Sequence, residues 1–258
     1  MDLKNITLSI CDLCRGVGDF MKKQSLIFKE EQIEVKGLHD FVSYVDKTSE
    51  QMIIKHLKEL LPEAGFIAEE SGESLAERYN WIIDPLDGTT NYLHHIPMYA
   101  ISIALKEYDE VILGVVYEVG HDECFYSWKG ERCFLNDKEI HVSMKRELGD
   151  SFVATGFPYI DFTKLDKYIK VLREMMIETV GVRRIGTAAT DLAYVAAGRF
   201  EVFFEYALKP WDVAAGSFLV KQAGGVVTTF DGGDNYIFGR EIVAGNQWIH
   251  GKLTQILS

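Results

Sequence analysis

Residues 81–91 are Trp81-Ile82-Ile83-Asp84-Pro85-Leu86-Asp87-Gly88-Thr89-Thr90-Asn91, an apolar run that leads into two acids. The run predicts a buried strand that Pro85 and Gly88 end. Two carboxylates three positions apart then lie together at the end of the strand, with two threonine hydroxyls behind them. Oxygen ligands on a rigid strand suit hard cations such as Mg²⁺. The alternative is a polar turn in which Asp caps the next helix.

Composition and charge narrow the possible partners. The chain has 258 residues, of which 47% are apolar and 26% charged, as in ordinary globular proteins. The net charge of −12 argues against nucleic acid or an anionic membrane as partner, because both select basic surfaces. An anionic small substrate stays compatible if cations bridge it to the protein.

The sequence predicts a cytoplasmic location. No apolar run approaches the ~20 residues of a membrane span, and Asp2 and Asp12 interrupt the N-terminus, unlike a signal peptide. Four cysteines fit a reduced compartment. Cys11 and Cys14 form a CxxC pair, but no second Cys or His pair completes a zinc site, so helix-face packing is the favoured interpretation.

Apolar spacing predicts helices over 6–21 and 48–61 in the first half, the second stopped by Pro62. The charged segment 29–35 suggests a hairpin. Turn-like residues separate the strand-like segments 99–105, 111–119, 124–128 and 140–142. Connections this short force antiparallel pairing.

Strands and helices alternate in the second half, which predicts an α/β layer. The expected elements are strands at 152–154, 181–184, 202–204, 226–230 and 242–244 and helices at 165–176, 187–197 and 213–223. A boundary near residue 150 gives an α+β half, 1–150, and an α/β half, 151–258. No linker is visible, so we expect the halves to share an interface.

Three further acidic pieces accompany the opening motif. Glu69-Glu70-Ser71 follows a short apolar run. Asp212 stands directly before a predicted helix, where it would be a good N-cap, although a helix N-terminus also favours anionic ligands. Asp40 and Asp46, with Lys36 upstream, are either site residues or solvated turn and cap residues.

Together these pieces resemble the inositol monophosphatase family, within the wider group of lithium-sensitive, magnesium-dependent sugar phosphatases. The resemblance covers essentially the whole chain. Its motifs are DFVSYVD (40–46), FIAEES (66–71), WIIDPLDGTTNY (81–92), GTAA (186–189), LKPWDVAAG (208–216) and AGG (223–225). The motif at 208–216 resembles bacterial inositol monophosphatases more than the fructose-bisphosphatase or nucleotide-phosphatase branches. Ser43 and Tyr92 depart mildly, where Thr and Phe are frequent.

The resemblance implies an αβαβα layered sandwich with an antiparallel N-terminal sheet and a smaller mixed C-terminal sheet with flanking helices. It implies a homodimer, lithium inhibition, and hydrolysis of myo-inositol 1-phosphate with two or three Mg²⁺ per active site, for which Mn²⁺ can substitute. Glu69, Asp84 and the carbonyl of Leu86 match ligands of one Mg²⁺. Asp84, Asp87 and Asp212 match ligands of a second, and a third, weaker ion lies beside Glu69.

The family's catalytic and substrate positions also map onto this sequence. Thr89, backed by Asp46, resembles the pair that orients and deprotonates the attacking water, and Glu69 counts with them as catalytic. The amides of Gly88 and Thr89 match the phosphate site. Positions that match contacts to the substrate are Asp87, Gly186, Thr187, Ala188, Glu205 and Asp212. No role is assigned to Glu70, Lys36, His94 or His95.

The negative charges of the predicted site residues independently favour bound cations. Two like charges 4 Å apart repel by ~4 kcal/mol at an effective dielectric near 20, and the four acids Glu69, Asp84, Asp87 and Asp212 would repel a phosphate. Oxygen ligands favour Mg²⁺ or Mn²⁺ over zinc, and two metals can acidify water and stabilise a leaving oxygen. No Ser or Cys with a paired His is evident, so we predict direct attack by water.

Other substrates and one other class stay open. The same chemistry could act on fructose 1,6-bisphosphate, histidinol phosphate, adenosine 3′,5′-bisphosphate or a phosphoinositide headgroup. A non-catalytic binding protein on the same fold is the rival from another class. Such a protein usually loses its acids, and this chain keeps all of them together with Thr89 and Asp46.

Overall fold

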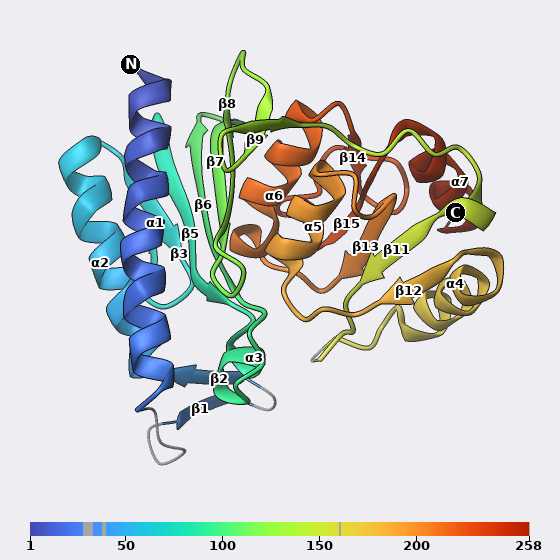
Figure 1. The fold of residues 1–258 in the computed structure, drawn as a ribbon, viewed down its shortest axis with the longest axis horizontal. Helices are drawn as coiled ribbons and strands as arrows, with labels where there is room; N and C mark the ends of the chain where they lie inside the picture. The colour runs from blue at the N-terminus through green and yellow to red at the C-terminus, as the bar shows by residue number, and fades with distance from the viewer. Residues whose placement is uncertain (28–32, 38–39, 160, 258) are drawn as a thin grey trace.

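The molecule is built from five layers (Figure 1). A computed structural model describes residues 1–27, 33–37, 40–159 and 161–257, and of 33–37 and 40–43 it describes the backbone only. Two helices cover one face of a large sheet, two more fill the space between this sheet and a smaller one, and two lie on the outer face of the smaller sheet. The predicted αβαβα sandwich is confirmed.

The first layer pairs α1 (Leu3–Ser25) with α2 (Tyr44–Leu60). Asp2 begins α1 by accepting a hydrogen bond from the Asn5 amide at 3.1 Å. Helix α2 begins four residues before the predicted start, so Asp46 lies in its first turn. Asp46 is only 1% exposed, which excludes the solvated-turn alternative for this residue.

The large sheet has the strand order β10-β9-β8-β7-β6-β5-β3-β4. Its strands are β3 (Gly65–Ala68), β4 (Gly72–Ser74), β5 (Tyr79–Asp87), β6 (Ala100–Glu107), β7 (Glu110–Glu118), β8 (Glu123–Trp128), β9 (Cys133–Leu135) and β10 (Lys138–Ile140). The hairpins from β5 to β10 are antiparallel, as their short connections predicted. Strand β3 pairs in parallel with β5, because β4 first turns back along the outer edge of β3. This sheet is therefore mixed, whereas we expected a purely antiparallel sheet in the N-terminal half.

Strand β5 continues past the point where we expected it to end. Asp84 pairs with Ser102 and Asp87 with Ala100, so three steps on β5 face two on β6, which is a bulge. Pro85 has no amide hydrogen to donate, and a bulge is one of the few places in a sheet that accept proline. The prediction that Pro85 ends the strand is wrong, and the bulge sets the direction of both carboxylates.

The smaller sheet has the order β12-β11-β13-β15-β14. Its strands are β11 (Phe152–Thr155), β12 (Gly181–Arg183), β13 (Val202–Tyr206), β14 (Val226–Thr228) and β15 (Glu241–Gly245). Strand β11 pairs in parallel with β12 and β13, and β15 is antiparallel to β13 and β14, so the sheet is mixed as predicted. Helices α4 (Leu165–Glu178) and α7 (Gln247–Leu257) cover its outer face (Figure 1).

Several short or terminal elements have no counterpart in the sequence predictions. They are β4, β9, α7, α3 (Thr89–Leu93) and the 3₁₀ turn η2 (Leu148–Asp150). Strands β1 (Ile33–Gly37) and β2 (Asp40–Ser43) form a two-stranded antiparallel ribbon. The hairpin predicted at 29–35 lies mostly outside the described residues.

The central helices α5 (Ala188–Ala196) and α6 (Pro210–Gln222) join the two halves of the chain. One apolar cluster contains Ile82 and Phe125 from the large sheet, Leu192 and Leu219 from the helices and Phe203 from the small sheet. Each such buried side chain contributes about 1.5–3 kcal/mol. The boundary near residue 150 stays a prediction, but residues on both sides of it share this core. No described helix combines the length and apolar character of a membrane span.

Candidate active site

Two of the predicted site residues lie at the bulged end of β5. Asp84 is 2% exposed, and its Oδ1 accepts a hydrogen bond from the Leu86 amide at 3.0 Å. Asp87 is half-buried, and its Oδ2 accepts the Ala189 amide at 2.7 Å and the Thr187 hydroxyl. Asp87 is thus fixed between the large sheet and the start of α5, where the helix dipole favours a negative charge.

Asp212 reaches the same place from the start of α6. The helix begins at Pro210, so Asp212 is its third residue, and the prediction that it is the N-cap is wrong. Proline is favoured in the first turn because its missing amide hydrogen is not needed there. The Asp212 carboxylate instead accepts the Lys209 amide at 2.7 Å. The Ser102 hydroxyl donates to the Trp211 carbonyl at 3.0 Å, which holds this end of α6 against β6.

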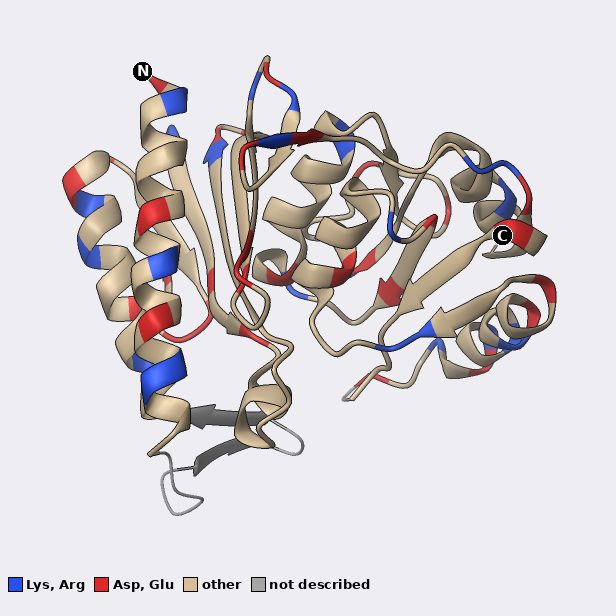
Figure 2. Ribbon diagram, viewed as in Figure 1, with Lys and Arg blue, Asp and Glu red and all other residues tan. Residues whose placement is uncertain are grey.

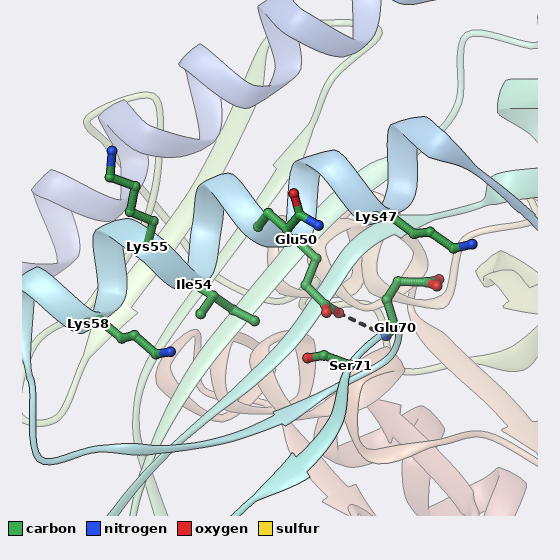
Figure 3. Close-up of a pocket in the computed structure, with 8 residues that line it drawn as sticks. Lys47, Glu50, Ile54, Lys55, Lys58, Glu70 and Ser71 are labelled. Atoms are coloured by element: carbon green, nitrogen blue, oxygen red, sulfur yellow. Dashed lines mark hydrogen bonds between the residues drawn. The ribbon is translucent and has the colours of Figure 1, made fainter.

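Glu69 and Glu70 face different surroundings. Glu69 is close enough to Asp84 to raise the pKa of that carboxyl by its charge and by a hydrogen bond. Glu70 extends instead over α2, beside Lys47, and its amide donates to the Glu50 carboxylate at 2.8 Å (Figure 3). Of the pair, the geometry brings Glu69 to the other acids.

Glu69, Asp84, Asp87 and Asp212 form what we call the acidic cluster. Burial, followed by the charges of the other three acids, raises the pKa of Asp84 well above its usual range. Burial raises the pKa of Asp87 to about 6 and that of Asp212 to about 7. Three segments, the residue after β3, the end of β5 and the start of α6, therefore bring these four carboxylates together. Figure 2 shows acidic residues in red where the central helices meet the strand ends.

The donor set of this cluster fits a hard divalent cation. All four side chains offer oxygen, and each hydrogen bond to Asp84, Asp87 and Asp212 named above occupies one oxygen of a carboxylate that has two. Across the described ranges, no three Asp, Glu, His or Cys side chains already converge into a closed ligand group.

Thr89 and Asp46 are in contact, as the resemblance implied for this pair. The Thr89 hydroxyl lies 3.2 Å from Asp46 Oδ1 and 3.0 Å from the Leu86 carbonyl. Gly88 has φ 93°, a left-handed conformation that turns the chain from β5 into α3. A Cβ there would lie 3.2 Å from the Met98 carbonyl, so the loop is closely packed.

A cavity of about 420 Å³ opens beside Asp87 and Asp212. Among the residues that line it are the predicted substrate positions Gly186, Thr187, Ala188 and Glu205. The Asn91 side chain ties the two halves together here, because its amide donates to the Met98 carbonyl at 2.8 Å and the Ile185 carbonyl at 3.0 Å.

Glu205 lies at the end of β13 and is 7% exposed. Its carboxylate packs on Gly156 so closely that a Cβ there would come within 2.0 Å of it. Burial and then the charge of Asp212 raise the pKa of Glu205 well above its usual range, while the Arg184 guanidinium opposes the shift.

Sequence reasoning missed Arg184, Asp191 and Tyr206, which line the same cavity. Asp191 carried a signal, because it is a lone acid in the otherwise uncharged helix α5. With Glu205 these residues form what we call the C-terminal wall. His94 and His95 are exposed and absent from the lining of this cavity, and the Lys36 side chain lies outside the described residues.

The fold and the acid-lined cavity agree with a phosphatase. The chain belongs to the inositol monophosphatase family, whose model matches residues 2–258, and it is a phosphatase. It is 41% identical over 246 residues to a putative Nus factor SuhB of Neisseria meningitidis, covering 95% of this chain and 94% of that protein. It is 40% identical over 237 residues to an inositol-1-monophosphatase of Mesorhizobium japonicum, covering 91% and 87%.

A solved structure agrees with the fold. The extragenic suppressor protein SuhB of Bartonella henselae matches with a TM-score of 0.94 and 39% identity, over 99% of both chains.

Proposed function

We propose that this phosphatase hydrolyses a small polyol phosphomonoester, with myo-inositol 1-phosphate as its preferred substrate, and that it requires Mg²⁺. The observation that carries the proposal is the acidic cluster, which three separate segments bring together beside the Asp46–Thr89 contact. Support for the substrate comes from the 40% identity to a protein named inositol-1-monophosphatase.

In this proposal Glu69, Asp84, Asp87, Asp212 and the Leu86 carbonyl hold two or three Mg²⁺, or Mn²⁺ in their place. Bound divalent cations supply positive charge for the phosphate and acidify the attacking water.

The chain's own residues orient the reactants. When the Thr89 hydroxyl donates to Asp46, its oxygen can accept a hydrogen bond from the attacking water. Asp46 then takes the hydroxyl proton of Thr89 while Thr89 takes one from the water, whose oxygen bonds to phosphorus. The bond from phosphorus to the alcohol oxygen breaks, and that oxygen takes up a proton from solvent water. The amides of Gly88 and Thr89 bind the phosphate, and the cavity residues Gly186, Thr187, Ala188 and Glu205 contact the alcohol.

The test is phosphate release with Mg²⁺ from myo-inositol 1-phosphate, fructose 1,6-bisphosphate, histidinol phosphate, adenosine 3′,5′-bisphosphate and a phosphoinositide. We expect the highest kcat/KM for inositol phosphate and loss of release with a chelator. Preference for another phosphate ester of the panel would change the assigned substrate and leave the proposed mechanism as it is. Release that persists in chelator would contradict the metal requirement, and lithium should inhibit if the weakest ion is replaceable.

We extend the proposal to a homodimer. Ile169, Met176 and Ile177 of α4 and the neighbouring Val180 are large apolar residues that stay exposed. Clustered exposed apolar residues are typical of interaction surfaces. Light scattering of the purified protein would distinguish dimer from monomer.

The name of the Neisseria relative, putative Nus factor SuhB, favours a second, binding role as another candidate. If the chain only binds a partner, wild-type protein will release no phosphate from any member of the panel. If the chain is both a phosphatase and a binding protein, a variant without phosphatase activity will still bind the partner.

A further inference from the structure

Glu50 is a buried acid of α2 that belongs neither to the acidic cluster nor to the lining of the cavity beside it. It is 3% exposed, and its Oε2 accepts the Glu70 amide at 2.8 Å (Figure 3). Burying a carboxylate is costly unless it is well paired. Glu70 is only half-buried, so water could bind its amide instead. The stability of the fold alone therefore does not account for a carboxylate at this position.

The hydrogen bond to Glu50 holds the turn that carries Glu69. Glu69 directly follows β3, and its own amide donates to the Ile83 carbonyl of β5 at 3.3 Å. The next amide, that of Glu70, donates to Glu50. Two successive amides are thus fixed to two different elements, on either side of the Glu69 side chain. Ile83 precedes Asp84, so these contacts hold Glu69 next to that carboxylate, with which it makes a hydrogen bond.

Helix α2 contacts the site at two places from one face. Asp46 and Glu50 are four residues apart, so they lie on the same face of the helix, and both are buried. Asp46 contacts the Thr89 hydroxyl after β5, and Glu50 contacts the turn after β3. Strands β3 and β5 pair in parallel, so their ends lie at the same edge of the sheet. One helix face therefore sets the two turns relative to each other.

We propose that Glu50 is a positioning residue, which places Glu69 for Mg²⁺ through its hydrogen bond to the amide that follows Glu69. The inference rests on the proposed function and adds to it a residue outside the set of metal ligands. Loss of a group that orients a metal ligand typically costs about 10–100-fold in metal affinity. The role requires an acceptor at the reach of a glutamate side chain, whereas a direct electrostatic role would require its negative charge.

Two variants separate these roles. Glu50→Gln keeps an acceptor oxygen at the same reach without the charge, and Glu50→Asp keeps the charge on a side chain one methylene shorter. Thermal unfolding with Mg²⁺ alone gives the Mg²⁺ concentration needed for a fixed rise in Tm, because a bound ion stabilises the folded state by mass action. We expect Glu50→Asp to need about tenfold more Mg²⁺ than wild type, and Glu50→Gln to need nearly the same as wild type.

Steady-state kinetics should agree with the binding measurement. In Glu50→Asp, the Mg²⁺ concentration for half-maximal phosphate release from myo-inositol 1-phosphate should rise by a similar factor, while KM for the substrate at saturating Mg²⁺ stays near that of wild type. Gln51→Ala is the control, because Gln51 is the exposed neighbour in α2, lines the same surface groove as Glu50 and should change neither quantity. A merely structural role would lower the Tm in chelator and leave the Mg²⁺ requirement as it is.

An unchanged Mg²⁺ requirement in Glu50→Asp, or a loss in Glu50→Gln as large as that in Glu50→Asp, would overturn the assignment while the proposed function stands. If the Tm of the wild-type protein does not respond to Mg²⁺ and phosphate is released without it, the proposed metal requirement itself fails.

Discussion

The acidic cluster and the C-terminal wall face the same cavity but balance their charges differently. In the acidic cluster, neighbouring acids raise the pKa of Asp84, and the local partners of Asp84 and Asp212 are backbone amides. In the C-terminal wall, Arg184 lies among the acids and opposes the rise in pKa of both Asp191 and Glu205.

Arg184 also opposes the rise in pKa of Asp87, and Lys209 opposes that of Asp212, whereas every cause that acts on the pKa of Asp84 raises it. The contrast is therefore sharpest between Asp84, which depends on cations from solution, and the C-terminal wall.

This difference separates two tasks in one cavity. Uncompensated carboxylates repel a phosphate until cations bind, so the acidic cluster suits the anionic end of the substrate only with metal present. A wall with its own guanidinium suits the uncharged end of the substrate. The two regions should therefore respond differently to mutation and to chelators.

The largest expected effect comes from breaking the acidic cluster. Asp84→Asn removes the most buried carboxylate of the cluster, and activity should fall by several orders of magnitude, since 1.36 kcal/mol is tenfold in rate. The fold should survive, and in chelator the Tm should stay level or rise because one repelling charge is gone. Phosphate release and thermal unfolding in chelator measure the two results.

A matched control is Asp109→Asn, at an exposed acid in the turn between β6 and β7 of the same sheet. It should change neither activity nor the Tm in chelator. Activity of Asp84→Asn within tenfold of wild type would remove Asp84 from the metal ligands and end the contrast between the two regions.

A smaller loss is expected at the Thr89–Asp46 contact. Thr89→Ala removes the hydroxyl that lies 3.2 Å from Asp46, and positioned proton transfer contributes about 10²–10⁴-fold. kcat should fall while KM for inositol phosphate changes little, because the C-terminal wall is intact. Thr89→Ser keeps the hydroxyl and should recover most of the rate. If the serine variant is as slow as the alanine variant, the hydroxyl is not the active group.

The two regions also differ in how much of them the sequence predicts. Glu69, Asp84 and Asp87 come from compact motifs in which an apolar strand runs directly into acids, so the strand ends are recognisable locally. The choice of Glu69 over Glu70 and the ligand role of Asp212 came from the resemblance.

The C-terminal wall takes its residues from three segments, Arg184 after β12, Asp191 in α5 and the end of β13, and only packing of α5 between two sheets brings Asp191 near Arg184. Of that wall, only Glu205 was predicted, and by resemblance.

The same contrast applies to the fold. The periodic helices and the β5–β10 hairpins follow from local pattern, and they are confirmed. The bulge that carries β5 past Pro85 depends on pairing with β6, and the start of α6 at Pro210 depends on contacts such as Ser102 with the Trp211 carbonyl. Long-range pairing decided both, so local signals placed these ends two or three residues away.

A third prediction tests the C-terminal wall without touching its polar groups. Gly156→Ala places a Cβ about 2 Å from the Glu205 carboxylate, which must move. We expect KM for inositol phosphate to rise on the order of tenfold, with a smaller change in kcat because the acidic cluster is untouched. Gly149→Ala is the control, since a Cβ there meets nothing within 4 Å. Equal KM values in both variants would show that Glu205 does not need its present position.

The smallest expected effect is on the pH dependence of the free energy of unfolding, to which His250 contributes. This residue of α7 lies outside the cavity and is 7% exposed, with Nε2 2.9 Å from the Thr228 hydroxyl. Burial lowers the pKa of His250 below its usual 6.5. The unfolded chain therefore binds more protons once the pH falls below 6.5. The stability contributed by neutral His250 is complete above that pH and is lost as the pH falls toward the folded pKa.

His250→Gln removes this titration and keeps a polar group near Thr228. In chelator, the urea midpoint of wild type should drop more between about pH 7.5 and about pH 5.5 than that of the variant. The acidic cluster titrates in both proteins, so its contribution cancels in the comparison. Equal drops would mean that His250 adds nothing, and the whole pH dependence would then belong to the carboxylates of the cavity.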